Sequence, residues 1–232
     1  MRVVVTRPQD RAEATAASLR GMGHEPQPLP LSRARHLPDQ ARELLAEKHA
    51  AIAVTSAEAL RAVAGFDLSA HLTRPLFAVG RKTAAAAQEA GFKTIEIADG
   101  DGASLAALIA RNAPAGVVYL TGKPRSPTFE MALQAANIPH TVIECYEMIP
   151  LAPSNEDVLA MFDPPPAAIL FHSRETARLF FALPAIAKNL AVLSPGLIAC
   201  LSARVAEEVP PALRDRVKIA ERPDESALLA LL

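Results

Sequence analysis

Ser and Thr residues recur where strand-like runs of this sequence give way to helix-like runs, mostly beside a basic residue. Six junctions share the pattern: Thr6-Arg7-Pro8, Thr55-Ser56, Gly80-Arg81-Lys82-Thr83, Thr121-Gly122-Lys123, His172-Ser173-Arg174 and Leu201-Ser202. In a parallel sheet the strand ends share one edge, where helix N-termini present N–H groups and a positive dipole end. Such an edge binds carboxylate or phosphate without net positive charge. One junction is usually only a helix cap, but the repetition indicates a polyanionic ligand.

The sequence contains none of the common motifs for a nucleotide site, a metal site or a catalytic serine. The sequence has no Gly-x-Gly-x-x-Gly after a strand, no Walker A lysine motif, no His-Glu-x-x-His and no Gly-x-Ser-x-Gly. The six histidines are scattered, and neither Cys145 nor Cys200 has a second ligand at a suitable spacing. This pattern favours two reduced, buried thiols. We therefore expect neither a metal nor a nucleotide cofactor.

The composition is typical of a globular protein and argues against several partners. The 232 residues are 50% hydrophobic and 21% charged, which suffices for one large domain or two small ones. The net charge of −1 creates no general attraction to nucleic acid or membrane. Because neither a signal peptide nor a membrane-spanning run is recognisable, we expect a cytoplasmic protein.

Strand-like and helix-like runs alternate along the chain, which predicts parallel sheets with helices on both faces. The predicted strands are 3–5, 51–55, 76–79, 94–97, 117–121, 140–144, 167–171 and 217–220, with weaker ones at 26–31 and 190–200. The predicted helices follow Asp10 and occupy 39–48, 57–64, 82–90, 104–111, 128–136, 174–182, 202–208 and 225–231. Asp10 and Glu13 are expected to form a capping box on the first helix.

The two halves of the sequence are similar to each other. Three pairs of segments occur in the same order in both halves: 3–8 with 118–124, 51–56 with 168–173, and 104–105 with 226–227. This repetition predicts two similar α/β domains. Proteins built in this way usually bind ligands in the cleft between the domains.

The chain resembles the uroporphyrinogen-III synthases in several segments that follow the family's order. They are Val4-Val5-Thr6-Arg7-Pro8, Ala53-Val54-Thr55-Ser56-Ala57, Phe77-Ala78-Val79-Gly80-Arg81-Lys82-Thr83-Ala84 with Glu89-Ala90-Gly91, Cys145-Tyr146-Glu147-Met148-Ile149-Pro150 and Phe171-His172-Ser173. The segments extend over nearly the whole chain, and the one around Lys82 is the most specific. The chain departs from the family at 199–203, where a second glycine-containing turn is absent, so Ser202 is a weaker candidate than Thr83.

The resemblance implies an α/β fold of two flavodoxin-like domains with parallel sheets, joined by two extended linker strands. On this pattern residues 1–33 and 151–232 form one discontinuous domain, and residues 34–150 form the other. Pro28 and Pro150 flank the expected linkers, and proline suits extended connectors. Because only two links join the domains, we expect hinge motion between them.

The resemblance also implies a cyclising hydro-lyase that acts on hydroxymethylbilane, a linear tetrapyrrole with eight carboxylates. The reaction removes water from the terminal hydroxymethyl group and closes the ring with inversion of ring D, giving uroporphyrinogen III for haem biosynthesis. The substrate alone closes without inversion. Catalysis is therefore mainly positioning, together with fixed dipoles around an azafulvenium cation. No cofactor is implied.

The resemblance assigns roles to the residues at the junctions. Tyr146 is the candidate to assist departure of the hydroxyl, as general acid or hydrogen-bond donor, and simple packing of its ring is the alternative. The residues expected to bind substrate are Thr6, Arg7, Thr55, Ser56, Lys82, Thr83, Thr121, Gly122, Ser173, Arg174 and Ser202.

The expected partner is the small-molecule tetrapyrrole, without nucleic acid or membrane. We expect a monomer, and leave open a transient contact with hydroxymethylbilane synthase. A non-catalytic two-domain protein that binds an organic polyanion is the alternative function; the family-ordered motifs count against it. A flavodoxin-like nucleotide module would need a phosphate-binding glycine loop or an acidic pocket, and the sequence has neither.

Overall fold

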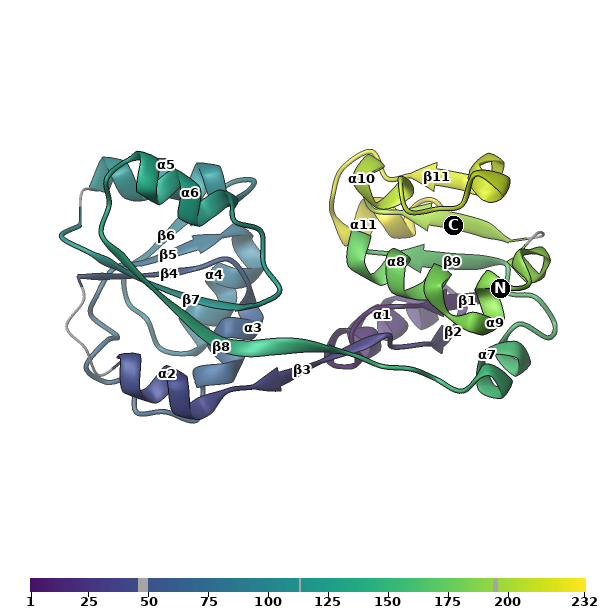
Figure 1. Cartoon of the computed structure of the whole chain (residues 1–232), viewed down its shortest axis with the longest axis horizontal. Coiled ribbons are helices and arrows are strands. Elements are labelled where there is room, and N and C mark those ends of the chain that lie inside the picture. Colours follow the sequence, from purple (N-terminus) through teal and green to yellow (C-terminus); the bar gives the residue numbers. More distant parts are fainter. Residues whose placement is uncertain (46–49, 113, 194–195) are drawn as a thin grey trace. The chain divides into compact units, whose positions relative to one another are not determined.

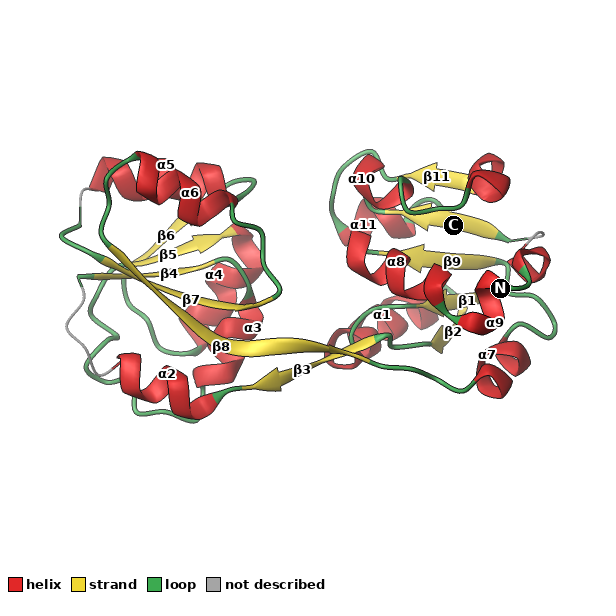
Figure 2. Cartoon of the chain, viewed as in Figure 1, coloured by secondary structure: helices red, strands yellow, loops and turns green. Residues whose placement is uncertain are grey.

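The computed structural model describes residues 1–45, 50–112, 114–193 and 196–232, which form two compact α/β units. Unit 1 comprises Met1–Arg33 and Ile149–Leu232, and unit 2 comprises Ala34–Met148. Figure 1 shows that each unit has its own sheet with helices on both faces, and Figure 2 separates the strands from the helices by colour. The predicted α/β class with parallel sheets is confirmed.

Unit 1 contains a five-stranded sheet in the order β11-β10-β9-β1-β2, in which all pairs are parallel. The strands are β1 (Arg2–Val5), β2 (Glu25–Pro28), β9 (Ala168–Phe171), β10 (Leu197–Cys200) and β11 (Val217–Ile219). The helices are α1 (Gln9–Gly21), α7 (Asn155–Met161), α8 (Arg174–Ala182), α9 (Pro184–Ala187), α10 (Ala203–Ala206) and α11 (Glu225–Leu229), with 3₁₀ turns at Leu190–Leu193 and Pro211–Arg216.

The first strand shows why the strands of unit 1 are apolar along their whole length. Side chains alternate between the faces of a strand, so Val3 and Val5 share one face and Val4 takes the other. Val3 and Val5 pack with α1 and α11, including Leu19, whereas Val4 packs with α8, including Phe180. Because helices cover both faces, all three valines are fully buried.

Unit 2 contains a six-stranded sheet in the order β3-β8-β7-β4-β5-β6. The strands are β3 (Ser32–His36), β4 (Ala51–Val54), β5 (Leu76–Val79), β6 (Ile95–Ala98), β7 (Val117–Lys123) and β8 (His140–Pro150), and β3 and β8 cross the boundary between the units. The helices are α2 (Pro38–Leu45), α3 (Ala57–Val63), α4 (Gly80–Glu89), α5 (Gly102–Asn112) and α6 (Thr128–Ala135). One core cluster lies between the sheet and α3 and α4, and a second lies between the sheet and α5 and α6.

Several elements differ from the sequence-based expectation. The predicted capping box on the first helix is wrong, because α1 begins at Gln9 with Pro8 at its N-cap, so Asp10 lies inside the helix. Residues 190–200 contain a 3₁₀ turn before strand β10. Strand β3 lies outside the predicted strand ranges and β8 continues six residues beyond the predicted end at residue 144, but these are the two strands that cross the unit boundary, as the linker strands implied by the resemblance do. Helices α7 and α9 lie outside the predicted helix ranges. The last part of the predicted helix 39–48 lies outside the described residues.

Candidate functional site

The predicted site residues of unit 2 meet at the carboxyl edge of its sheet. Strands β8, β7, β4 and β5 are neighbours in that order, and their register pairs Tyr146 with Gly122. Thr55 and Ser56 follow β4 directly, and the first turn of α4, with exposed Lys82, follows β5. The topology therefore brings together side chains that are as far as 91 residues apart, from 55 to 146, in the sequence.

Tyr146 lies directly on Gly122. A methyl group built on Gly122 would overlap Cζ and Cε2 of the Tyr146 ring and lie 2.7 Å from Cε1. The tyrosine is half-buried and packs against the core cluster between the sheet and helices α3 and α4. The two predicted site residues thus form one feature at the carboxyl edge, in which the Tyr146 ring packs on the glycine of strand β7.

The two hydroxyl groups that follow β4 have different partners. Ser56 caps α3, since its Oγ accepts a hydrogen bond of 3.2 Å from the Glu58 N–H. Thr55 Oγ1 lies 2.9 Å from the phenol oxygen of Tyr119, a residue only 2% exposed. The Tyr119 ring packs edge-to-face on Phe129, with centroids 4.7 Å apart. Sequence reasoning missed Tyr119, because its place in an apolar strand marked it only as a core residue.

Three of the predicted threonines are buried. Thr6, Thr121 and Thr83 are 0%, 3% and 6% exposed. Thr6 Oγ1 donates a hydrogen bond of 2.7 Å to the carbonyl oxygen of Leu170, which links β1 to β9. All three side chains are withdrawn from the surface, so the more exposed candidates at these edges are the ones accessible to a ligand.

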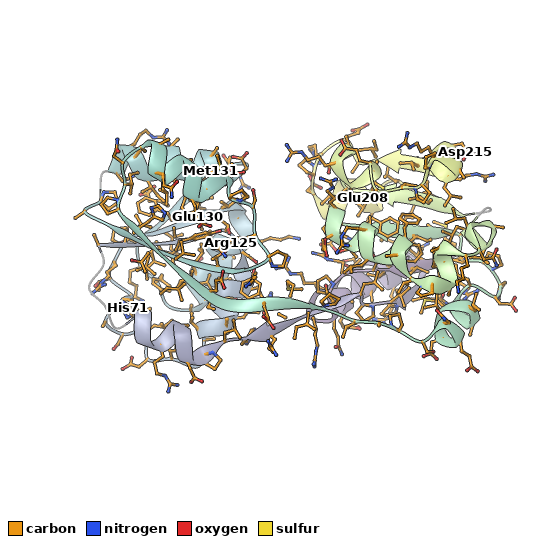
Figure 3. All side chains as sticks on the ribbon, in the orientation of Figure 1. His71, Arg125, Glu130, Met131, Glu208 and Asp215 are labelled. Atoms are coloured by element: carbon orange, nitrogen blue, oxygen red, sulfur yellow. The ribbon has the colours of Figure 1, made fainter. Side chains whose placement is uncertain are left out.

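An ion-pair cluster holds the loop that follows β7. Arg125 Nε lies 2.6 Å from Glu130 Oε1 on α6, and its Nη1 lies 2.6 Å from Glu144 Oε1 on β8. Figure 3 shows Arg125 and Glu130 together beside α6. The hydrogen bond to Glu130, with a further contribution from Glu144, raises the pKa of Arg125. This arginine is therefore engaged in joining the loop to α6 and β8.

The predicted residues of unit 1 lie at the carboxyl edge of its own sheet, where Arg7 follows β1, Ser173 follows β9 and Ser202 follows β10. Ser173 caps α8 by accepting a hydrogen bond of 3.1 Å from the Thr176 N–H. Ser202 occupies the N-cap position of α10, but among the described residues its hydroxyl forms no capping hydrogen bond. Of these two serines, Ser173 therefore caps its helix through its hydroxyl, whereas Ser202 does not.

The two predicted arginines at this edge, Arg7 and Arg174, are ion-paired. Arg7 Nη1 lies 2.9 Å from Glu225 Oε1 and 3.0 Å from Thr15 Oγ1, in a mostly buried position. Arg174 pairs with Glu208, and this hydrogen bond raises the pKa of Arg174. The pairs hold the guanidinium groups in place. A substrate carboxylate can bind them only by sharing them with a glutamate.

Within the described ranges, no group of three or more His, Cys, Asp or Glu side chains could hold a metal ion. No helix in the described part of the chain combines the length and apolar character that a bilayer crossing requires.

Each of the two α/β units has polar and cationic side chains at the carboxyl edge of its sheet, which is where α/β proteins of this class have their ligand sites. Within this class, the family model for uroporphyrinogen-III synthase HemD matches residues 13–230, and the chain belongs to this family. The family resemblance seen in the sequence is thereby confirmed.

Solved structures show the same fold. The chain is 18% identical to uroporphyrinogen-III synthetase from Helicobacter pylori, with a TM-score of 0.66 and coverage of 100% of this chain and 98% of that one. It is 21% identical to a mutant uroporphyrinogen III synthase from Thermus thermophilus, with a TM-score of 0.60 and coverage of 100% and 97%. At these identities the likeness shows the fold alone. Among curated proteins, none matches the chain.

Proposed function

We propose that this chain closes hydroxymethylbilane into uroporphyrinogen III with inversion of ring D and loss of water. The observation that carries the proposal is the family match, which extends over residues 13–230 and so includes both units. The same match favours an enzyme over the polyanion-binding alternative. The family consists of cyclising lyases of tetrapyrrole biosynthesis.

The carboxyl edge of each sheet supplies groups suited to a substrate with many carboxylates. In unit 2 these are the exposed Lys82 and the first turn of α4, whose N–H groups and dipole favour an anion. In unit 1 they are the Ser202 hydroxyl and the guanidinium groups of Arg7 and Arg174. Glu225 and Glu208 pair with these two guanidinium groups and offset their positive charge.

Tyr146 is the residue to which we assign departure of the substrate hydroxyl. Its phenol transfers a proton to the leaving oxygen of the hydroxymethyl group as the carbon–oxygen bond breaks, so that water leaves, and the tyrosinate then takes up the proton that the substrate releases when the ring closes. The azafulvenium cation that remains is stabilised by fixed dipoles and carboxylates, with restricted access of water. The half-buried ring of Tyr146 on Gly122 supports this role, because it fixes the direction of the phenol.

The enzyme must select one of two closures rather than create reactivity. The substrate alone closes without inversion, so the protein has to hold the two ends of the chain in the arrangement that leads to the inverted product. Many weak contacts serve this purpose better than one strong nucleophile. We therefore propose that the predicted residues that remain accessible at the strand ends, Thr55, Lys82 and Ser202 among them, act by positioning, in a cytoplasmic monomer.

Genetic rescue tests the proposal. A bacterial strain that lacks its own uroporphyrinogen-III synthase requires added haem, and expression of this chain is expected to remove that requirement. Expression of an unrelated protein is the control for the vector. A chain that accumulates in folded form but leaves the strain dependent on haem would overturn the proposal and favour the polyanion-binding alternative.

A further inference from the structure

The pairing of β7 with β8 is irregular at the point where Tyr146 lies. The register pairs Thr121 with Glu144, but it pairs the next residue, Gly122, with Tyr146. Cys145 is therefore an extra residue in β8, as in a β-bulge. Bulges bend a strand and redirect the side chains that follow, and they are frequent beside active sites.

The bulge turns Tyr146 toward a face that it would not reach in a regular strand. Side chains alternate along a strand, so Ile143 and Cys145 share one face, and both are fully buried in the cluster beside α3 and α4. Regular alternation would direct Tyr146 to the opposite face, yet its ring packs against the same cluster. The Cys145 thiol donates to the Thr121 carbonyl oxygen at 3.2 Å, which stabilises the irregular pairing.

Gly122 supplies the space that the redirected ring needs. Residues paired across two strands place their side chains on the same face, so a side chain at 122 and the Tyr146 ring would compete for one volume. A methyl group there would lie 2.7 Å from Cε1 and closer still to Cζ and Cε2. These atoms are the outer end of the tyrosine, so a substitution at 122 displaces the phenol and spares the strand.

We infer that Gly122 and the bulge at Cys145 are positioning features that aim Tyr146 at the carboxyl edge. Gly122 thus acts through Tyr146 and not through the direct substrate contact that the sequence predicts for it. The catalytic consequence rests on the proposed function, whereas the positioning itself does not.

Fluorine NMR of the chain labelled with fluorotyrosine tests the positioning. The chain has two tyrosines, so two resonances are expected, and Tyr146→Phe identifies which belongs to Tyr146. Gly122→Ala is expected to shift the Tyr146 resonance and leave that of Tyr119 unchanged. Gly116→Ala is the matched control, because its nearest neighbour, the Pro139 carbonyl oxygen, is 3.8 Å from the added carbon. An unshifted Tyr146 resonance in Gly122→Ala would overturn the inference.

Thermal unfolding gives a second test, which remains informative if Gly122→Ala is too unstable for NMR, because the loss of stability is itself what is measured. Gly122→Ala is expected to lower the Tm in the wild-type background and to lower it much less in a Tyr146→Ala background, because the clashing ring is gone. Equal losses in both backgrounds would contradict the contact.

Turnover separates this inference from the proposed function. Gly122→Ala is expected to slow formation of the type III isomer to the level of Tyr146→Phe, with no further loss in the double variant. A shifted resonance with unchanged type III formation would overturn the catalytic role of Tyr146 and leave the family assignment intact. A wild-type chain that forms no type III isomer would overturn the proposed function. The Tyr146 resonance and the Tm comparison would still test whether Gly122 positions Tyr146.

Discussion

At the scale of single residues, the hydroxyl groups at the strand ends divide into those that serve the fold and those available to a ligand. Ser56 and Ser173 each accept a hydrogen bond from a helix N–H, as N-cap residues do. Ser202 has the same position but, within the described residues, no capping hydrogen bond. All three serines follow a predicted strand and precede a predicted helix, and the sequence ranks Ser202 as a weak candidate, so only the structure shows that its hydroxyl is the one not used as a cap.

Ser202→Ala and Ser173→Ala form a matched pair that tests this division. We expect Ser202→Ala to raise the KM for hydroxymethylbilane by about tenfold, through loss of one hydrogen bond to a charged group, with little change in stability. Ser173→Ala is expected to lower the free energy of unfolding by about 1 kcal/mol through loss of a cap. Urea unfolding and initial rates measure both effects. A Ser202→Ala protein that is destabilised but has an unchanged KM would contradict the assignment.

The two thiols are predicted to be inert. Burial raises the pKa of both Cys145 and Cys200 to about 12. At pH 8 such a thiol is about one part in ten thousand thiolate, so labelling should be far slower in the folded chain than in urea. Because the folded-state pKa lies above the ordinary value of 9.0, these thiols should also reduce stability as the pH rises from 9 toward 12. Rapid labelling of the folded chain at pH 8 would refute this prediction.

At the scale of elements, apolar runs located the central strands because helices bury them on both faces, as the fully buried strand β4 shows. The edge strand β3 could not be predicted in this way. Its residues Arg33, Arg35 and His36 are exposed, and the strand lies beside β8 through pairing that no local pattern encodes. The bulge at Cys145 could not be predicted for the same reason, because the register of β8 depends on its partner strand β7.

Close packing of α5 on α6 predicts a cost for one small substitution. A methyl group on Gly102 would lie 2.8 Å from Phe129 Cβ and 3.1 Å from its backbone nitrogen. Because backbone cannot move as a side-chain tip does, Gly102→Ala should lower the free energy of unfolding by about 1–3 kcal/mol. Gly65→Ala is the control, since no described atom lies within 4 Å of the added carbon. Equal stability of the two variants in urea would refute the packing argument.

At the scale of the whole molecule, each of the two units has hydrophobic core clusters of its own. Two of the core clusters consist only of residues from unit 1, and the other two only of residues from unit 2. The boundary between the units lies at Met148 and Ile149, whereas the family resemblance predicts a domain boundary after residue 150.

A core substitution should therefore act on one unit. Phe180 is fully buried in the cluster between α8 and the sheet of unit 1. Phe180→Ala is expected to cost about 3–5 kcal/mol and to speed hydrogen exchange in 1–33 and 149–232 far more than in 34–148. Mass spectrometry of peptides from each unit measures this difference. Equal acceleration in both units would contradict separate cores.

The central claim is that the chain directs ring closure toward the inverted isomer. The most direct test feeds freshly made hydroxymethylbilane to the purified chain, without added cofactor or metal, and separates the oxidised type I and type III products by chromatography. We predict that the type III isomer dominates, whereas a sample without protein gives type I. Type I alone, at the rate of the sample without protein, would contradict the claim.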